Sequence, residues 1–492
     1  MKKIVQSVCF ALLILTNLSA QQFSISYTST AFTGSFTGNV VVFLSKENHH
    51  PKDVSASLDN FTCFTIAVKN IQPGQTVIVN DKAISFPTTL SNIERGNYYI
   101  QAVWDRNLGG RAICTSPGNM FNPTQKIIIN KNTNATFKIV CDSVIPIVPA
   151  FKESAFDKEL KVPSALLTTF HKKSITVDAA IILPAEYYKE PEKKFPVMFI
   201  VSGYGGDYHG FSGDTLPSDA LDSIPCIWIY LDGNCPLGHS VYANSDNNGP
   251  WGDALTQEFI PALENKYRCN GARLLTGHSS GGWTVLWLQT HYPKVFAGCT
   301  SSSPDYVDFR SFAQIDLYAQ KNLFYGKDST LNPVGTIAGF LPWLYMKNSY
   351  QIENVVYRGE QMHSFDAVFS KKAADGNPER ICNPVTGNVN ANTFANWQKF
   401  DISLYLRTNW DAIKADLDGK VRVSVGNGDN FLLNHPVKLL EKEMKKLNAN
   451  FKFAYYPGDH FTVSTRDYQK DKIAFLKQKY LEWLIKTGTK IN

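Results

Sequence analysis

The sequence lacks the local patterns by which proteins usually bind metal ions. No cysteine pair has CxxC spacing and no group of residues has zinc-ligand spacing, so neither a metal nor another cofactor is expected. Clusters of one charge are absent too. Lysine and arginine total 49 against 43 acidic residues, and the excess of six is spread along the chain. This balance does not predict a nucleic-acid or anionic-lipid partner.

Long apolar runs are scarce. The run near the start, from Val8 to Leu15, is too short to span a bilayer, and no other run approaches about 20 residues. Two lysines precede it and the small residue Ala20 follows it, which is typical of a secretory signal peptide over residues 1–20. No cysteine follows the cleavage site, which argues against a lipoprotein. We therefore expect an exported protein, secreted or periplasmic, without membrane insertion once the leader is removed.

Cysteines are present in moderate number: nine in all, and eight once Cys9 leaves with the leader. An oxidising compartment would allow one disulfide or two. Apolar surroundings such as IPCIWIY suit buried free thiols equally well. The sequence therefore leaves the state of these cysteines open.

The chain changes character near residue 143. Residues 21–142 contain short β-rich runs separated by turn signals, the pattern of a small β-sandwich. Residues 143–164 carry three prolines and mixed charge, as expected of a linker. From residue 165 to residue 492, strand-like and helix-like segments alternate. This alternation predicts an α/β domain with a mostly parallel sheet covered by helices.

Two adjacent serines lie between a strand-like run and a helical pattern in LLTGHSSGGWTVLW, residues 274–287. A nucleophile elbow places its serine in a strained turn between strand and helix, with glycine two residues away on each side. Only Ser279 meets this spacing, because Gly277 and Gly281 flank it. We therefore predict Ser279 as the nucleophile and Ser280 as a backbone N–H donor of an oxyanion hole. The alternative is a glycine-rich turn with incidental serines.

A serine nucleophile needs a base and an orienting acid, which follow it in the order acid, then histidine, in this arrangement. His460 lies in FAYYPGDHF, on a late loop after a strand-like run, and is the predicted base. His291 ends a helix and His435 starts one, so both fit less well. Asp429 follows the strand-like VRVSV and is the predicted acid. Asp459 competes by proximity, but neighbouring residues rarely face each other well enough.

The second oxyanion donor is expected in the loop after the third strand. In FPVMFIVSGYGGDYHG, the residues Ser202, Gly203 and Tyr204 stand where such enzymes have a His-Gly-x turn. The backbone N–H of Tyr204 is therefore the candidate donor. The alternative is a plain glycine-rich loop.

The region from residue 165 to residue 492 resembles the putative esterase family of α/β-hydrolases, which includes esterase D-like, feruloyl esterase-like and enterochelin esterase-like proteins. The segments that carry the resemblance are SGYGG, YANSDNNGPWGDALTQEFIPALENKYR, TGHSSGGW, SSSPDYVDFR, VGNGDNFLL and PGDH. The resemblance implies an α/β-hydrolase fold and a triad of Ser279, Asp429 and His460 that works without a cofactor. Two features depart from it: Ser202 replaces the commoner histidine, and about 150 residues separate Ser279 from Asp429. We therefore expect an insertion at about 310–405 that caps the pocket.

The favoured interpretation is an exported serine carboxylesterase whose ester substrate is linked to a carbohydrate or to an aromatic acid. Flat aromatic rings of the insertion could hold such groups, although most of them are expected to build its own core. They are Phe312, Tyr318, Phe324, Tyr325, Phe340, Trp343, Tyr345, Tyr350 and Trp397. One alternative is a peptidase of the prolyl oligopeptidase type, for which the roughly 120-residue β-rich segment is too short to form a propeller. Another is a catalytically silent protein that binds a glycan or a partner.

Overall fold

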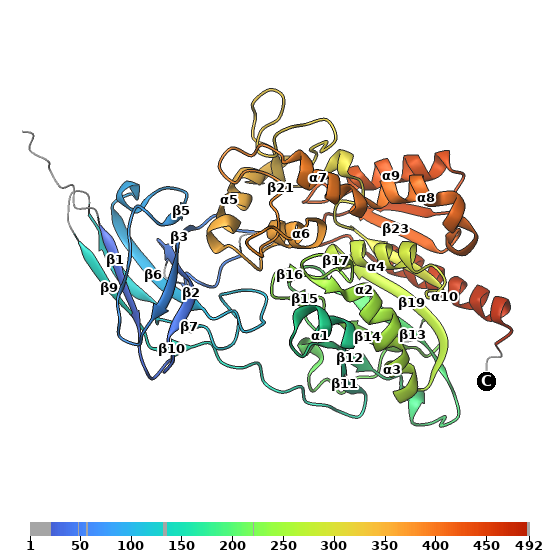
Figure 1. Ribbon diagram of the computed structural model, residues 1–492. Helices are drawn as coiled ribbons and strands as arrows, with labels where there is room; N and C mark the ends of the chain where they lie inside the picture. The colour runs from blue at the N-terminus through green and yellow to red at the C-terminus, as the bar shows by residue number, and fades with distance from the viewer. Residues whose placement is uncertain (1–20, 48, 56–57, 131–134, 220, 490–492) are drawn as a thin grey trace, which may run out of the picture.

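The computed structural model describes residues 21–489 apart from residues 48, 56–57, 131–134 and 220. The expected leader at 1–20 lies outside the described residues. Figure 1 shows a β-rich N-terminal part beside a larger part in which helices cover a sheet, with an extended connection between them. Within the described part of the chain, no helix is long and apolar enough to cross a membrane.

The N-terminal part consists of two sheets packed around one apolar core. The smaller sheet has the strand order β4-β1-β9, and the larger one has the order β10-β7-β6-β2-β3-β5 with β8 paired to β6. Phe23 and Tyr27 of the small sheet and Trp104 of the large sheet share this core. The strands are β1 (Gln22–Tyr27), β2 (Phe36–Ser45), β3 (Thr62–Ile71), β4 (Val77–Val79), β5 (Ile84–Phe86), β6 (Gly96–Asp105), β7 (Met120–Phe121), β8 (Gln125–Ile129), β9 (Thr136–Cys141) and β10 (Ser143–Val144).

The outer face of the large N-terminal sheet is also covered. Val41 and Phe43 of β2 pack in one cluster with Ile352 and Val355 of helix α5 (Met346–Val356), which comes from the larger part of the molecule. Burial on both faces explains why β2 is a continuous apolar run rather than an alternating one. The two parts of the chain therefore share an apolar interface.

The larger part is built on an eight-stranded sheet of order β11-β12-β14-β13-β19-β20-β23-β24. Strand β12 runs antiparallel to both neighbours, and the strands from β14 to β24 are parallel. This is the α/β-hydrolase fold, so the expected fold class, with its β-rich N-terminal part, is confirmed. The strands are β11 (Asp157–Pro163), β12 (Thr176–Ile182), β13 (Phe195–Val201), β14 (Ile227–Leu231), β19 (Cys269–His278), β20 (Gly298–Ser302), β23 (Val421–Gly426) and β24 (Lys452–Tyr456).

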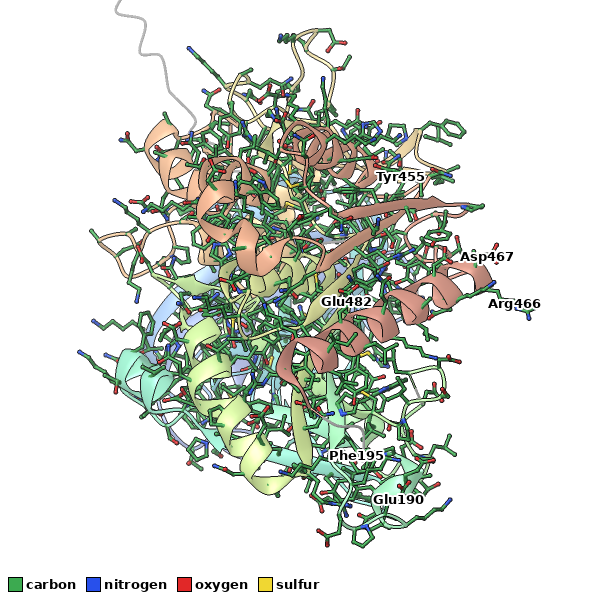
Figure 2. The ribbon with its side chains drawn as sticks, turned by 90° about the vertical axis from the view of Figure 1, so that its right-hand side faces the viewer. Glu190, Phe195, Tyr455, Arg466, Asp467 and Glu482 are labelled. Atoms are coloured by element: carbon green, nitrogen blue, oxygen red, sulfur yellow. The ribbon has the colours of Figure 1, made fainter. Side chains whose placement is uncertain are left out.

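Helices cover both faces of this sheet. Alternate residues of β13 point to opposite sides: Met198 packs against α10, and Phe199 packs in the core that includes α4. Figure 2 shows α10 running along its face from Arg466 and Asp467 toward Glu482. The helices of this part are α1 (Ala165–His171), α2 (Trp251–Asp253), a π-helical turn (Ala254–Phe259), α3 (Ile260–Lys266), α4 (Ser280–His291), α8 (Ile402–Leu417), α9 (Asn434–Lys446) and α10 (Arg466–Thr487).

Parallel pairing brings the carboxyl ends of five strands to one edge. Val201 of β13 pairs with Gly277 of β19, which pairs with Ser301 of β20, and Gly426 of β23 pairs with Tyr456 of β24. The loops that follow these ends hold residues 202–206, 279, 303–305, 427–430 and 457–460. The register therefore gathers every predicted site residue at one edge, as in other open α/β sheets.

A long segment between β20 and β23 adds further elements above this edge. It contains the hairpin β21 (Pro333–Ile337) and β22 (Leu341–Tyr345), helix α5, and helices α6 (Gln361–Phe369) and α7 (Ala391–Trp397). Phe312, Phe324, Tyr350 and Trp397 are buried in it, and Phe340 is 76% exposed. The eight cysteines from Cys63 to Cys382 are free, and all but Cys269 are buried.

Candidate active site

Ser279 lies in a strained turn between β19 and α4. Its backbone has φ 59° and ψ −126°, a region that costs a non-glycine residue about 1–3 kcal/mol. A Cβ atom on Gly277 would lie 2.2 Å from the carbonyl oxygen of Gly281, and one on Gly281 would lie 2.0 Å from that of Val201. Glycine at both positions is therefore required by close backbone contacts. The spacing noted in the sequence corresponds to a real nucleophile-elbow geometry.

The second serine makes a different set of contacts. Ser280 donates its hydroxyl proton to Asp305 Oδ2 at 2.6 Å, and Gln361 Nε2 lies 3.3 Å from Ser280 Oγ and 3.4 Å from Asp305 Oδ2. Burial raises the pKa of Asp305 to about 6, although the bond from Ser280 lowers it. Neither Asp305 nor Gln361 was predicted from the sequence as a site residue. Asp305 lies in the quoted segment SSSPDYVDFR, to which no role could be assigned, and no sequence signal pointed to Gln361.

Asp429 and His460 lie together in the loops after β23 and β24. His460 Nδ1 is 2.9 Å from Asp429 Oδ2, and both side chains are almost completely buried. Asp429 Oδ1 accepts the backbone N–H groups of Phe431 and Leu433 at 3.0 and 3.3 Å. The backbone N–H of His460 donates to Asn430 Oδ1 at 3.0 Å. Local bonds thereby fix the loop of Asp429, and the bond to Asn430 ties the loop of His460 to it.

The residues that competed with this pair lie elsewhere or are otherwise engaged. Asp459 accepts bonds from Phe461 N–H and from Thr462, and so closes its own turn. His435 is exposed on α9. His291, at the end of α4, is stacked on the Trp287 ring with centroids 3.6 Å apart.

A second histidine adjoins His460. The rings of His278 and His460 have centroids 4.6 Å apart, and His278 Nδ1 lies 3.2 Å from Ser302 Oγ. Burial, followed by the neighbouring His460, lowers the pKa of His278 to about 4. His278 is therefore neutral near pH 7 and adds no positive charge beside His460.

The loop after β13 approaches the elbow. A Cβ atom on Gly203 would lie 3.3 Å from Ser279 Cβ and 3.9 Å from Ser279 Oγ. Among the described residues, neither the N–H of Tyr204 nor that of Ser280 donates a hydrogen bond. The Ser280 N–H lies at the first turn of α4, where the helix dipole favours negative charge. Two unused donors are thus available at the edge where Ser279 lies.

Ser279 opens into a small cavity of about 60 Å³. The cavity is mostly apolar and is lined by Ser279, Asp305, Tyr306, Val334, Leu344, Ser349, Glu353, Gln361, Met362, Phe365, Phe431 and Leu433. Seven of these residues, from Val334 to Phe365, come from the segment above the sheet edge. That segment therefore covers Ser279.

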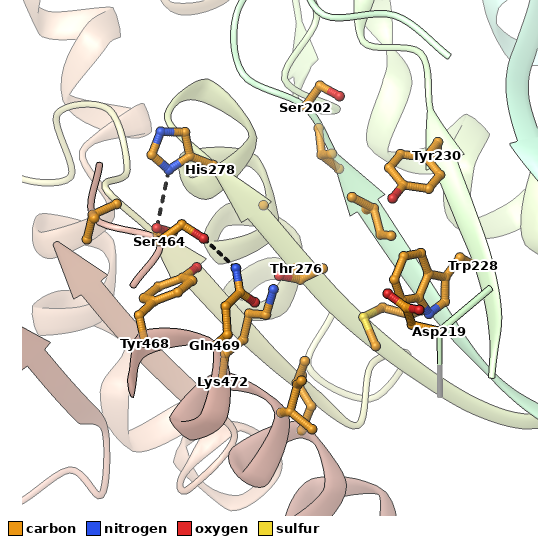
Figure 3. A pocket seen from close by; sticks show the side chains of 18 of the residues that line it. Ser202, Asp219, Trp228, Tyr230, Thr276, His278, Ser464, Tyr468, Gln469 and Lys472 are labelled. Carbon is orange, nitrogen blue, oxygen red and sulfur yellow. Dashed lines mark hydrogen bonds between the residues drawn. The ribbon is translucent and has the colours of Figure 1, made fainter. Parts of the chain in front are cut away.

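A larger cleft of about 410 Å³ lies on the α10 face of the sheet. His278 and His460 line it, but Ser279 does not. Figure 3 shows Trp228 and Tyr230 on one side and Lys472 of α10 on the other. Within the described residues, no group of three His, Cys, Asp or Glu residues is placed to hold a metal ion.

Comparison with curated proteins found no match. Among solved structures, a ferulic acid esterase is 14% identical with TM-score 0.38, over 67% of this chain and 99% of the other. An S-formylglutathione hydrolase from Agrobacterium tumefaciens is 14% identical with TM-score 0.39, over 66% and 98%. Dipeptidyl peptidase 4 from Porphyromonas gingivalis is 13% identical with TM-score 0.38, over 86% of this chain and 49% of the other.

The model of the family described as "Putative esterase" matches residues 173–469, which is more than half of the 492 residues and includes Tyr204, Ser279, Asp429 and His460. The chain therefore belongs to the Putative esterase family, whose members are hydrolases that act on esters.

Proposed function

We propose that this protein is a serine carboxylesterase in which Ser279 is the nucleophile, His460 the general base and Asp429 the orienting acid. The observation that supports this most is the 2.9 Å contact between His460 Nδ1 and Asp429 Oδ2, at the same sheet edge as a serine in elbow geometry. A buried carboxylate beside Nδ1 fixes the tautomer in which Nε2 is free to accept a proton.

The reaction begins when Ser279 Oγ attacks the carbonyl carbon of the ester while its proton passes to His460 Nε2. The hydroxyl of Ser279 makes no capping bond to helix α4, and its bond to His460 Nε2 forms once substrate is bound. The N–H groups of Ser280 and Tyr204 stabilise the negative oxygen of the tetrahedral intermediate. Collapse transfers the proton from His460 to the leaving alcohol, and water then cleaves the acyl-enzyme by the same route.

The substrate that we propose is an ester of a carbohydrate or aromatic-acid conjugate, and the cavity beside Ser279 favours the carbohydrate ester. One water occupies about 10–15 Å³ in such a cavity, so about 60 Å³ holds an acyl group of only a few heavy atoms. At the same edge, Phe461 is 65% exposed and its ring lies 5.4 Å from that of His460. An exposed aromatic face beside the base suits the sugar ring of a leaving alcohol.

The protein would meet such an ester outside the cytoplasm if the expected leader directs its export. Secretion or periplasmic delivery is part of this proposal and rests on residues 1–20 of the sequence. Fractionation of expressing cells, with N-terminal sequencing of the product, tests it. Cleavage near Ala20 is the expected result, and an intact leader on a cytoplasmic protein would overturn it.

A panel of esters tests the activity. We expect purified protein to hydrolyse p-nitrophenyl acetate and an acetylated oligosaccharide, and to react with a fluorophosphonate probe, whereas Ser279→Ala does neither. Higher kcat/KM on methyl ferulate than on the acetylated sugar would reverse the preference for short acyl groups. Cleavage of an Ala-Pro anilide without ester hydrolysis would favour the peptidase, and a protein that is inert and unlabelled would favour the silent binder.

A further inference from the structure

The N-terminal part of the chain directly contacts the oxyanion loop, which is the loop of residues 202–206 after β13 that carries the predicted donor Tyr204. Arg111, in the loop after β6, donates from Nη1 to the hydroxyl oxygen of Tyr204 at 2.9 Å and to the carbonyl oxygen of Gly359 at 2.8 Å. Its guanidinium group also lies over the Tyr204 ring, 4.6 Å from the centroid. The Tyr204 hydroxyl in turn donates to Gly359. Arg111 thus binds both the Tyr204 side chain and the backbone at Gly359.

The same N-terminal loop is anchored by a buried ion pair. Arg358 donates from Nε and Nη2 to the two carboxylate oxygens of Asp105 at 2.6 and 2.7 Å. Both side chains are at most 3% exposed. Arg358 Nη1 also donates to the carbonyl oxygens of Gly110 and Arg111 at 2.7 and 2.9 Å. The position of Arg111 therefore depends on the bidentate ion pair between Arg358 and Asp105, which joins distant parts of the chain.

The segment that follows Arg358 leads to the cavity at Ser279. Gly359 has φ +80°, and a Cβ atom there would lie 2.1 Å from the carbonyl oxygen of Arg111. Two residues later, Gln361 contacts Ser280 and Asp305, and both Gln361 and Met362 line the cavity. The N-terminal loop is thus in direct contact with the segment that forms one wall of the cavity.

We propose that the N-terminal β-domain completes the active site, and that its Arg111 is a positioning residue that aims the Tyr204 N–H at the oxyanion. This inference rests on the proposed function. The oxyanion loop has little internal bonding, with a single backbone bond from Gly206 to Gly203 at 3.1 Å. From outside the loop, Asn234 Nδ2 donates to the Gly206 carbonyl oxygen at 2.9 Å, and fixation of the Tyr204 side chain sets the direction of the Tyr204 N–H. The β-domain acts through this contact and needs no ligand of its own for it.

Kinetics of the full-length protein test the proposal. In Arg111→Met, we expect kcat for p-nitrophenyl acetate, per folded molecule, to fall about ten- to a hundredfold, because small misplacement of a catalytic group has effects of this size. KM should change by less than about twofold, since the donor acts mainly in the transition state. Arg111→Lys keeps the charge without the planar fork and should recover only part of kcat.

Two comparisons separate positioning from simple domain adhesion. Arg95→Met, at an exposed arginine of the same β-domain, should leave kcat unchanged. In a Tyr204→Phe background, Arg111→Met should lower kcat by less than about threefold further, because coupled residues are not additive. A normal kcat in Arg111→Met, or losses that multiply fully in the double variant, would overturn the proposal. The proposed function would fail separately, through retained activity in Ser279→Ala.

Discussion

Ser280 donates its hydroxyl proton to Asp305 Oδ2 at 2.6 Å, and this bond ties the first turn of α4 to the loop after β20. The neighbouring Ser279 is held by the same turn but makes no such bond, so the two serines have different surroundings. This difference leads to opposite expectations for their replacement.

Ser279→Ala should abolish ester hydrolysis, whereas Ser280→Ala should retain most of it. Ser280→Ala keeps the backbone N–H but leaves Asp305 without its short hydrogen bond, so we expect a loss of stability of about 1–3 kcal/mol. Initial rates with p-nitrophenyl acetate and urea unfolding measure the two effects. Equal loss of activity in both variants, or probe labelling of Ser280, would refute the assignment of the nucleophile.

His460→Ala should disable the enzyme about as fully as Ser279→Ala, because residues of such a unit act together. Asp429→Asn should cost less, on the order of a thousandfold or more in kcat, since the base remains but loses its orienting partner. The matched control is His435→Ala on the exposed surface of α9, which should remain active. An active His460→Ala together with an inactive His435→Ala would transfer the role of base.

Asp305 should make stability depend on pH in a defined direction. Burial raises its pKa from 3.8 to about 6, so its contribution to stability is complete below pH 3.8 and is lost as the pH rises through 6. Asp305→Asn removes this loss, and the variant should gain stability relative to wild type between pH 4 and pH 7. Urea unfolding of both proteins at the two pH values measures this, and the same difference at both would contradict it.

Arg358→Met should destabilise the molecule by about 3–5 kcal/mol at pH 7, because it leaves the Asp105 carboxylate buried without its charged partner. Adding Asp105→Asn should recover part of this loss. Although burial opposes it, bonding to Arg358 keeps the pKa of Asp105 below its usual value. The wild-type ion pair therefore contributes fully to protein stability at pH values above the ordinary carboxyl pKa. This contribution is lost as the pH falls through the lowered pKa of Asp105.

Unfolding in urea at pH 7 and at pH 4 measures both parts of this prediction. The deficit of Arg358→Met should shrink at pH 4, where the unpaired Asp105 takes up a proton. A loss below 1 kcal/mol at pH 7, or no recovery in the double variant, would show that the ion pair is unimportant for stability.

The α/β-hydrolase fold and the elbow could be predicted because their causes are local. Alternating strand and helix patterns predict a parallel sheet, and the spacing of Gly277 and Gly281 around Ser279 is a short motif that can be recognised in the sequence. The chain order of acid and histidine then selected Asp429 and His460, which the structure places 2.9 Å apart. These two residues therefore lie together, whereas their catalytic roles and that of Ser279 stay predictions.

Other features depended on contacts between distant segments. Asp305 is 25 residues from Ser280, Arg111 is 93 residues from Tyr204, and Arg358 is 253 residues from Asp105. Residues 157–163, read as part of a linker, form the edge strand β11 through pairing with β12. An apolar run such as VVVFL in β2 has the same pattern whether a strand or a helix covers it, so α5 could not be inferred as its partner.

By itself, the sequence determined the fold class, the turn at Ser279 and the family, because hydrophobic periodicity and the glycine spacing of the turn are patterns of short stretches of chain. Only the tertiary structure decided that Arg111 of the β-domain contacts Tyr204, and that Asp305 and Gln361 contact the Ser280 hydroxyl. A side chain's partner across such a distance depends on strand register and on which surfaces pack together, and these are properties of the whole folded chain.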